Sequence, residues 1–96
     1  MERKPGGTIK IKASIEGVRH VWVVTQCPGE ALDSWFNRTV AIRNGTATLS
    51  AEQCADFECN GDMIHLCIPC MPSETEAQCK QRLRDAVELY KQIAGC

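Results

Sequence analysis

The sequence predicts an α+β fold, a single domain with the element order β-β-α-β-β-α-β-α. Three observations support this prediction. A strictly alternating segment precedes a Glu-Gly pair near the start, a second alternating segment surrounds an Asn-Gly pair, and apolar residues recur at spacings of three and four near the end. Alternation is typical of half-buried strands, and the longer spacing is typical of an amphipathic helix. We therefore expect a mostly antiparallel five-stranded sheet, with the long C-terminal helix packed on its apolar face.

One domain accounts for the whole length, residues 1–96. Residues 1–7 are expected to form a flexible terminus, because they combine charged residues with one proline and two glycines. Apolar residues make up 44% and charged residues 24%, which is ordinary for a globular protein. A chain of this length supports one modest core. Because the sheet and helices use nearly all the apolar residues, we expect few of them to line a pocket.

The first hairpin is predicted at residues 8–25. Residues 8–15 alternate between polar and apolar side chains, and Glu16-Gly17 is a two-residue turn signal before the return strand. A tight turn places Ile9 opposite Val24 and makes this face of the hairpin the apolar one. A shift of one residue would place isoleucines against lysines, so the register is well specified.

The middle of the chain is predicted as a short helix followed by a second hairpin. Residues 30–37 carry apolar side chains at helical spacing, with Trp35 and Phe36 as core anchors. Residues 39–49 alternate around Asn44-Gly45, which is the strongest short signal for a β-hairpin turn. We therefore expect the third and fourth strands here.

A second helix and a fifth strand are predicted next. Ser50 and Gln53 have the spacing of a capping box, so residues 50–59 are expected to be helical, and Asn60-Gly61 is a typical helix stop. Residues 63–68 are largely apolar on both faces, which indicates an inner strand with a partner on each side.

The last helix is predicted to begin after Ser73, as its N-cap, and to end at Gly95. Its apolar residues recur at spacings of three and four, so that one side can face the sheet. This is the longest predicted element, and it should contribute most of the cover over the sheet.

The seven cysteines raise the main chemical question. No charged segment followed by an apolar run opens the sequence, and the longest apolar run is too short to cross a membrane, so we expect a cytoplasmic protein. Thiols stay reduced in that compartment, and an odd number of cysteines argues against a disulfide framework. The favoured interpretation is that the thiols pack as small apolar side chains.

A zinc site is the first alternative. Its candidate ligands are Cys54, Cys59, Cys67 and Cys70, with His65 in reserve. Cys67-x-x-Cys70 has the spacing of half a structural zinc site. Cys54 and Cys59, five residues apart on a predicted helix, would point in different directions. No metal or other cofactor is therefore favoured, and zinc is the one to consider.

Thiol–disulfide exchange by Cys67-x-x-Cys70 is the second alternative. A thioredoxin-like motif needs further strands after it, and the sequence has too few residues left to form them. His65 lies two residues from Cys67 on one strand face and could serve it as a base. No third group that would orient the imidazole is evident, and His20 is expected among apolar residues of the core face.

Charge is unevenly distributed along a chain whose formal net charge is −1. The basic residues of the first hairpin are Lys10, Lys12 and Arg19, and the acidic residues around the predicted second helix are Glu52, Asp56, Glu58 and Asp62. Complementary charge steers association and sets register between proteins. These are the candidate partner-binding residues. Nucleic-acid binding through the basic hairpin is a further alternative, although it needs a larger concentration of Lys and Arg.

The sequence therefore predicts a small, non-catalytic binding protein that acts through a protein partner. It has no glycine-rich phosphate loop between a strand and a helix, and no paired carboxylates in a hydrolase-like context. Regulators and inhibitors, including those encoded by phages and other mobile elements, often have this size and build. A homodimer would be one way to close an exposed sheet edge.

Overall fold

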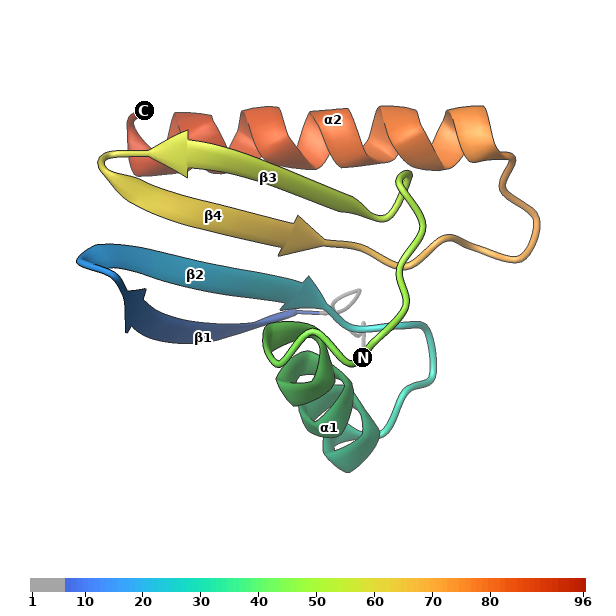
Figure 1. Cartoon of the computed structure of the whole chain (residues 1–96). Coiled ribbons are helices and arrows are strands. Elements are labelled where there is room, and N and C mark those ends of the chain that lie inside the picture. The colour runs from blue at the N-terminus through green and yellow to red at the C-terminus, as the bar shows by residue number, and fades with distance from the viewer. Residues whose placement is uncertain (1–6) are drawn as a thin grey trace, which may run out of the picture.

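The computed structural model describes residues 7–96 and is an α+β domain with four strands and two helices in that part of the chain. In chain order the elements are β1 (Thr8–Ile15), β2 (Val18–Thr25), α1 (Leu32–Arg43), β3 (Cys54–Cys59), β4 (Asp62–Cys67) and α2 (Glu76–Ala94). The two helices pack on opposite faces of one sheet (Figure 1). Most of the predicted flexible terminus, residues 1–6, lies outside the described residues.

The sheet consists of two antiparallel hairpins placed side by side, in the order β1-β2-β4-β3. β2 and β4 run parallel and join the hairpins, so the sheet is mixed and has four strands instead of the predicted five. The predicted register of the first hairpin is confirmed, with Ile9 opposite Val24. β4 is an inner strand as expected, since it pairs with β2 on one side and β3 on the other.

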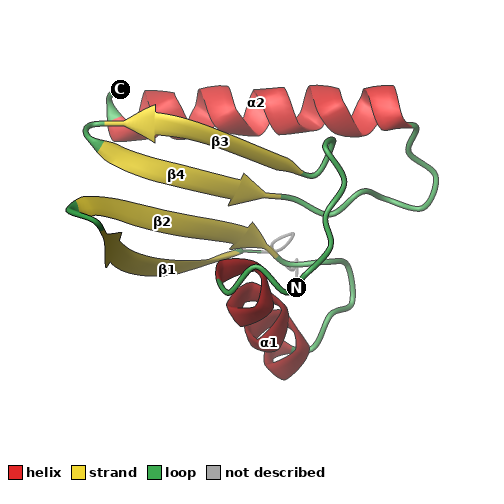
Figure 2. Cartoon of the chain, viewed as in Figure 1, coloured by secondary structure: helices red, strands yellow, loops and turns green. Residues whose placement is uncertain are grey.

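The predicted hairpin at 39–49 is wrong, because α1 continues through the first half of this segment to Arg43. Thr39 is fully buried, and its hydroxyl donates to the Trp35 carbonyl oxygen at 2.8 Å, one helical turn back. Asn44 caps the helix and Gly45 has a φ of +76°, so Asn44-Gly45 ends α1. The rest of the segment belongs to the long loop between α1 and β3 (Figure 2).

The predicted helix at 50–59 is also wrong. Ser50 and Gln53 do contact each other, but they form an isolated turn in which the Gln53 N–H donates to the Ser50 carbonyl oxygen. β3 follows and pairs with β4 across the tight turn at Asn60-Gly61. Both turn residues have positive φ, 54° and 86°, as a two-residue hairpin of this kind requires.

The last helix is confirmed, although its N-cap is Thr75 instead of Ser73. The Thr75 hydroxyl accepts from the Gln78 N–H, and the Gln78 side chain accepts from the Thr75 N–H, which completes a capping box. Gly95, in the left-handed conformation, ends the helix as predicted. The apolar stripe of α2 reaches the sheet through Leu83 and Tyr90, among others.

The face that α2 covers differs from the expected one. α2 packs on Val21 and Val23 of β2 and on the neighbouring residues of β4, whereas α1 covers one end of the isoleucine face of the first hairpin. The physical reason is that residues 21–24 of β2 are apolar on both faces and at most 8% exposed. A central strand of this composition needs cover on both sides.

Two disulfides hold α2 at both of its ends, one to the loop after β4 and the other to β3. Cys79, in the first turns of α2, is bonded to Cys70 in the loop after β4, and Cys96 is bonded to Cys59 at the end of β3. The C-terminus accordingly lies beside the β3–β4 turn (Figure 1). The expectation that all seven thiols stay reduced is therefore wrong for these four residues. Sequence spacing did not reveal the pairs, because each joins residues brought together only by the fold.

Candidate functional site

The four cysteines predicted as zinc ligands do not converge. Cys59 and Cys70 are each in a disulfide with a residue outside the predicted set. Cys54 and Cys67 face each other on β3 and β4 with their sulfurs 2.8 Å apart. The structure thus separates the predicted ligands into three different sulfur pairs. Cys67-x-x-Cys70 likewise does not form a bonded pair.

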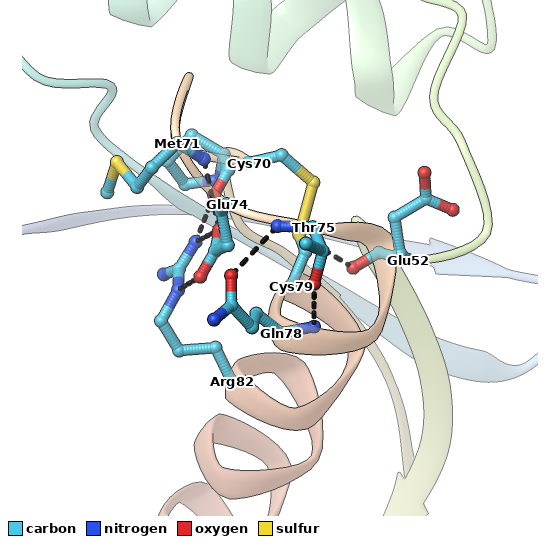
Figure 3. Close-up of polar contacts among 9 residues, drawn as sticks. Glu52, Cys70, Met71, Glu74, Thr75, Gln78, Cys79 and Arg82 are labelled. Carbon is cyan, nitrogen blue, oxygen red and sulfur yellow. Dashed lines mark hydrogen bonds and ion pairs between the residues drawn. A yellow bond between two sulfur atoms is a disulfide. The ribbon is translucent and has the colours of Figure 1, made fainter.

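A group of potential metal ligands is present at a different place, where Cys70, Cys79 and Glu74 lie within 4.8 Å of one another. Figure 3 shows why these atoms are already engaged. The two sulfurs are joined in the disulfide, and the Glu74 carboxylate accepts from the Arg82 guanidinium at 2.7 and 2.9 Å and from the Met71 N–H at 3.0 Å. Hydrogen bonding to Arg82, followed by the bond from Met71, lowers the pKa of Glu74 to about 2.

The Glu74–Arg82 ion pair and the Cys70–Cys79 disulfide hold the same loop against the start of α2. Cys79 is 1% exposed and packs with Ile68 and Leu83. The site is therefore best described as a structural clamp, in which an ion pair and a disulfide fix the loop before α2 to the start of that helix.

A row of polar and aromatic side chains crosses the face of the sheet on which α1 packs. His65 Nδ1 is 2.8 Å from the Asp56 carboxylate, and His65 Nε2 is 2.9 Å from His20 Nδ1. Since a carboxylate only accepts, His65 donates from Nδ1 and, when neutral, accepts from His20 at Nε2. The Trp22 ring stacks on His65 with centroids 4.9 Å apart, and the Arg43 guanidinium lies 5.5 Å from the Trp22 ring.

This arrangement changes the interpretation of His65. Asp56 is the orienting group for His65 that sequence reasoning did not find, because residues 50–59 were predicted as a helix. The contacts of the His65 imidazole are with Asp56, His20 and Trp22. These contacts give no support to the alternative in which His65 acts as a base for Cys67.

The predicted charged patches are partly neutralised by each other. Arg19 and Asp62, at the starts of β2 and β4, form an ion pair of 2.6 Å, and Asp56 is bonded to His65. Hydrogen bonding to Arg19 lowers the pKa of Asp62. Among the predicted partner-binding residues, those that form no ion pair in the described part of the chain are Lys10, Lys12, Glu52 and Glu58.

An apolar groove of about 430 Å³ runs between the first hairpin and α2, and the sequence did not predict it. Its floor and walls include Lys10, Val23, Leu66, Leu89, Tyr90 and Ile93. Leu89 and Ile93 are 56% and 79% exposed. Sequence analysis predicted that few apolar residues would be left to line a pocket, and the groove has several of them. The groove exists because α2 lies along the β3–β4 side of the sheet, leaving the β1 side less covered (Figure 1).

One sequence signal could have revealed the groove. Leu89 and Ile93 extend the apolar stripe of α2 sideways, so the stripe is wider than the sheet contact requires.

Neither helix of residues 7–96 has the length and apolar composition that crossing a membrane would require.

Comparisons with known proteins return no relative. The chain matches no protein-family model, no curated protein sequence and no solved structure at a significant level. The function of the chain is therefore inferred from the geometry of its residues.

Proposed function

We propose that this protein is a small, non-catalytic binding module that holds a segment of a protein partner in the groove between β1 and α2. The observation that carries the proposal is the exposure of Leu89 and Ile93 on the wall of that groove. Exposed apolar side chains that gather at a concave surface are typical of protein recognition sites.

The chemistry of the groove favours an amphipathic helix with acidic residues on one flank. The apolar lining suits the i, i+3, i+4 anchors of such a helix. Lys10 lies at the groove with its ammonium 5.7 Å from the Tyr90 ring, and Lys12 follows on the same face of β1. Since Arg19 is paired with Asp62, these two lysines are the cations of the first hairpin that remain for an acidic partner.

Photo-crosslinking in cells of the protein's native host tests this assignment. We expect benzoylphenylalanine at position 93 to crosslink one partner protein, through a peptide that combines apolar and acidic residues. The matched control carries the same group at Ala77, which is exposed on α2 but does not line the groove. The proposal is wrong if both positions give the same adducts, or if position 93 gives only a second copy of this chain.

A role as a regulator or inhibitor of that partner is consistent with the size of the protein, and we retain it as part of the proposal. The two disulfides favour an oxidising compartment over the predicted cytoplasm, because cytosolic reductants normally keep thiols reduced. None of the residues that line the groove is a cysteine, but α2, which forms one wall, is bonded at both ends by these disulfides, so we expect the groove to be best formed where they persist.

The alternatives have less support. Zinc binding by the predicted set, Cys54, Cys59, Cys67 and Cys70, would require reduction of both disulfides. Zinc binding at Cys70, Glu74 and Cys79 would require reduction of one disulfide and release of Glu74 from Arg82. Nucleic-acid binding through the first hairpin would have only Lys10 and Lys12 as unpaired cations of the predicted set, which is a small electrostatic footprint.

A further inference from the structure

We propose that Cys54 and Cys67 form a dithiol–disulfide couple that exchanges with accessible disulfides, with Cys54 as the attacking sulfur and Cys67 as the resolving sulfur. The proposal is independent of the groove. It assigns a redox site to a pair that is neither of the disulfides in the structure nor the Cys67-x-x-Cys70 motif.

The backbone brings the two sulfurs together. Cys54 and Cys67 are direct partners in the antiparallel register of β3 and β4, and their Sγ atoms are 2.8 Å apart. Opposed residues in such a pair have Cα atoms about 4.5–5.5 Å apart. Disulfides span Cα separations of about 4.4–6.8 Å. A bond between these sulfurs therefore requires no rearrangement of the strands.

The two thiols differ in access. Cys67 is 1% exposed and packs with Val24 and Trp35 beneath α1, whereas Cys54 is only half-buried at the start of β3. A disulfide in solution can reach Cys54 and not Cys67. This asymmetry is what an attacking and a resolving cysteine need.

Electrostatics place the thiolate on the accessible sulfur. The hydrogen bond from Cys67 lowers the pKa of Cys54, and this effect outweighs burial and the nearby Asp56 carboxylate, which both raise it. The same hydrogen bond, together with burial, raises the pKa of Cys67. The thiolate is the nucleophile in exchange, so the reaction begins at Cys54.

The exchange balances without any further reactant. The Cys54 thiolate attacks one sulfur of the incoming disulfide, which forms a mixed disulfide and releases the first thiolate. The Cys67 sulfur then attacks the Cys54 sulfur of the mixed disulfide. The proton of the Cys67 thiol passes to the second external sulfur, which leaves as a thiol. Two protein thiols are oxidised by two electrons, and one external disulfide is reduced to two thiols.

Cys27 provides an internal comparison. It is the other free cysteine of the described residues, and its pKa is raised mainly by burial. Its backbone N–H donates to the Glu30 carboxylate, and it has no sulfur partner in the structure. We therefore expect Cys27 to react slowly and not to form an internal disulfide.

The test treats the full chain, with both structural disulfides intact, with oxidised glutathione, followed by acid quenching, alkylation and peptide mass spectrometry. We expect a Cys54–Cys67 disulfide, no persistent glutathione adduct, and Cys27 still open to alkylation. In Cys67→Ser the glutathione should remain on Cys54, because no resolving thiol is present. Cys54→Ser should leave Cys67 unmodified, and Cys27→Ser should behave as the wild type does.

Two results would overturn the proposal. One is a wild-type chain in which Cys54 and Cys67 both remain alkylatable after a large excess of oxidised glutathione. The other is a folded Cys67→Ser variant that gains no adduct on Cys54. The wild-type thiol count decides the question by itself if that variant does not fold.

Discussion

Replacing Cys96 by serine is expected to lower the free energy of unfolding by about 4 kcal/mol. The Cys59–Cys96 disulfide joins residues 37 apart in sequence, and the entropy of closing a loop of that length corresponds to about this value. The Cys70–Cys79 disulfide joins residues only nine apart, so Cys70→Ser should cost about 2.5 kcal/mol. Both variants remove the more exposed member of their pair, which makes them matched.

Urea denaturation measures both variants under the same oxidising conditions. The expected order of decreasing stability is wild type, then Cys70→Ser, then Cys96→Ser. Cys96→Ser should lose a large part of the free energy of unfolding, which is typically 5–15 kcal/mol for a domain. In a reducing buffer all three should converge, because the disulfides are then absent from each. An unchanged midpoint for Cys96→Ser would show that the bond does not hold α2 to the sheet.

Ile64→Ala should cost about 3 kcal/mol of stability, whereas Ile93→Ala should change it by no more than about 0.5 kcal/mol. Ile64 is 1% exposed at the centre of the cluster beneath α2, and removing its buried atoms leaves a cavity. Ile93 is 79% exposed, so its truncation removes little packing. The loss of stability on the same Ile→Ala substitution thus distinguishes a core residue from a residue that lines the groove.

Thermal and urea unfolding of the two variants provide the comparison. A partner-binding groove requires that Ile93 be dispensable for folding, because its apolar side chain is otherwise part of the core. A loss for Ile93→Ala as large as that for Ile64→Ala would place Ile93 in the core and remove the main support for partner binding.

Local sequence signals predicted the elements whose partners lie next to them in the chain. The first hairpin and α2 were correctly predicted, because Glu16-Gly17 and the apolar spacing of the last helix decide their structure locally. The two Asn-Gly pairs show where such reasoning ends. The alternating residues around Asn44-Gly45 predict a hairpin turn, but this pair ends a helix. The capping-box spacing before Asn60-Gly61 predicts a helix stop, but this pair forms a hairpin turn.

The two pairs are alike because each provides residues that tolerate positive φ, which both kinds of turn can use. Tertiary partners decide between them. β4 needs an antiparallel neighbour on its free side, and residues 54–59 provide one with Phe57 turned toward α2. Thr39 is buried against α1's own backbone, so the helix continues where an alternating pattern indicated a strand.

The candidate sites were missed for the same reason. The Cys54–Cys67 pair and the Asp56–His65 bond both depend on the β3–β4 register. A helix over residues 50–59 would have separated them. The groove depends on which face α2 covers, and the composition of β2 allowed either face to be covered.

The division of the seven cysteines is the central claim, and a disulfide map of the native protein tests it most directly. The protein is quenched in acid without prior reductant, alkylated, digested and analysed by mass spectrometry. The structure predicts bonds between Cys59 and Cys96 and between Cys70 and Cys79, with Cys27 free and Cys54 and Cys67 found either both free or bonded to each other. Seven free thiols, or a bond between Cys67 and Cys70, would contradict it.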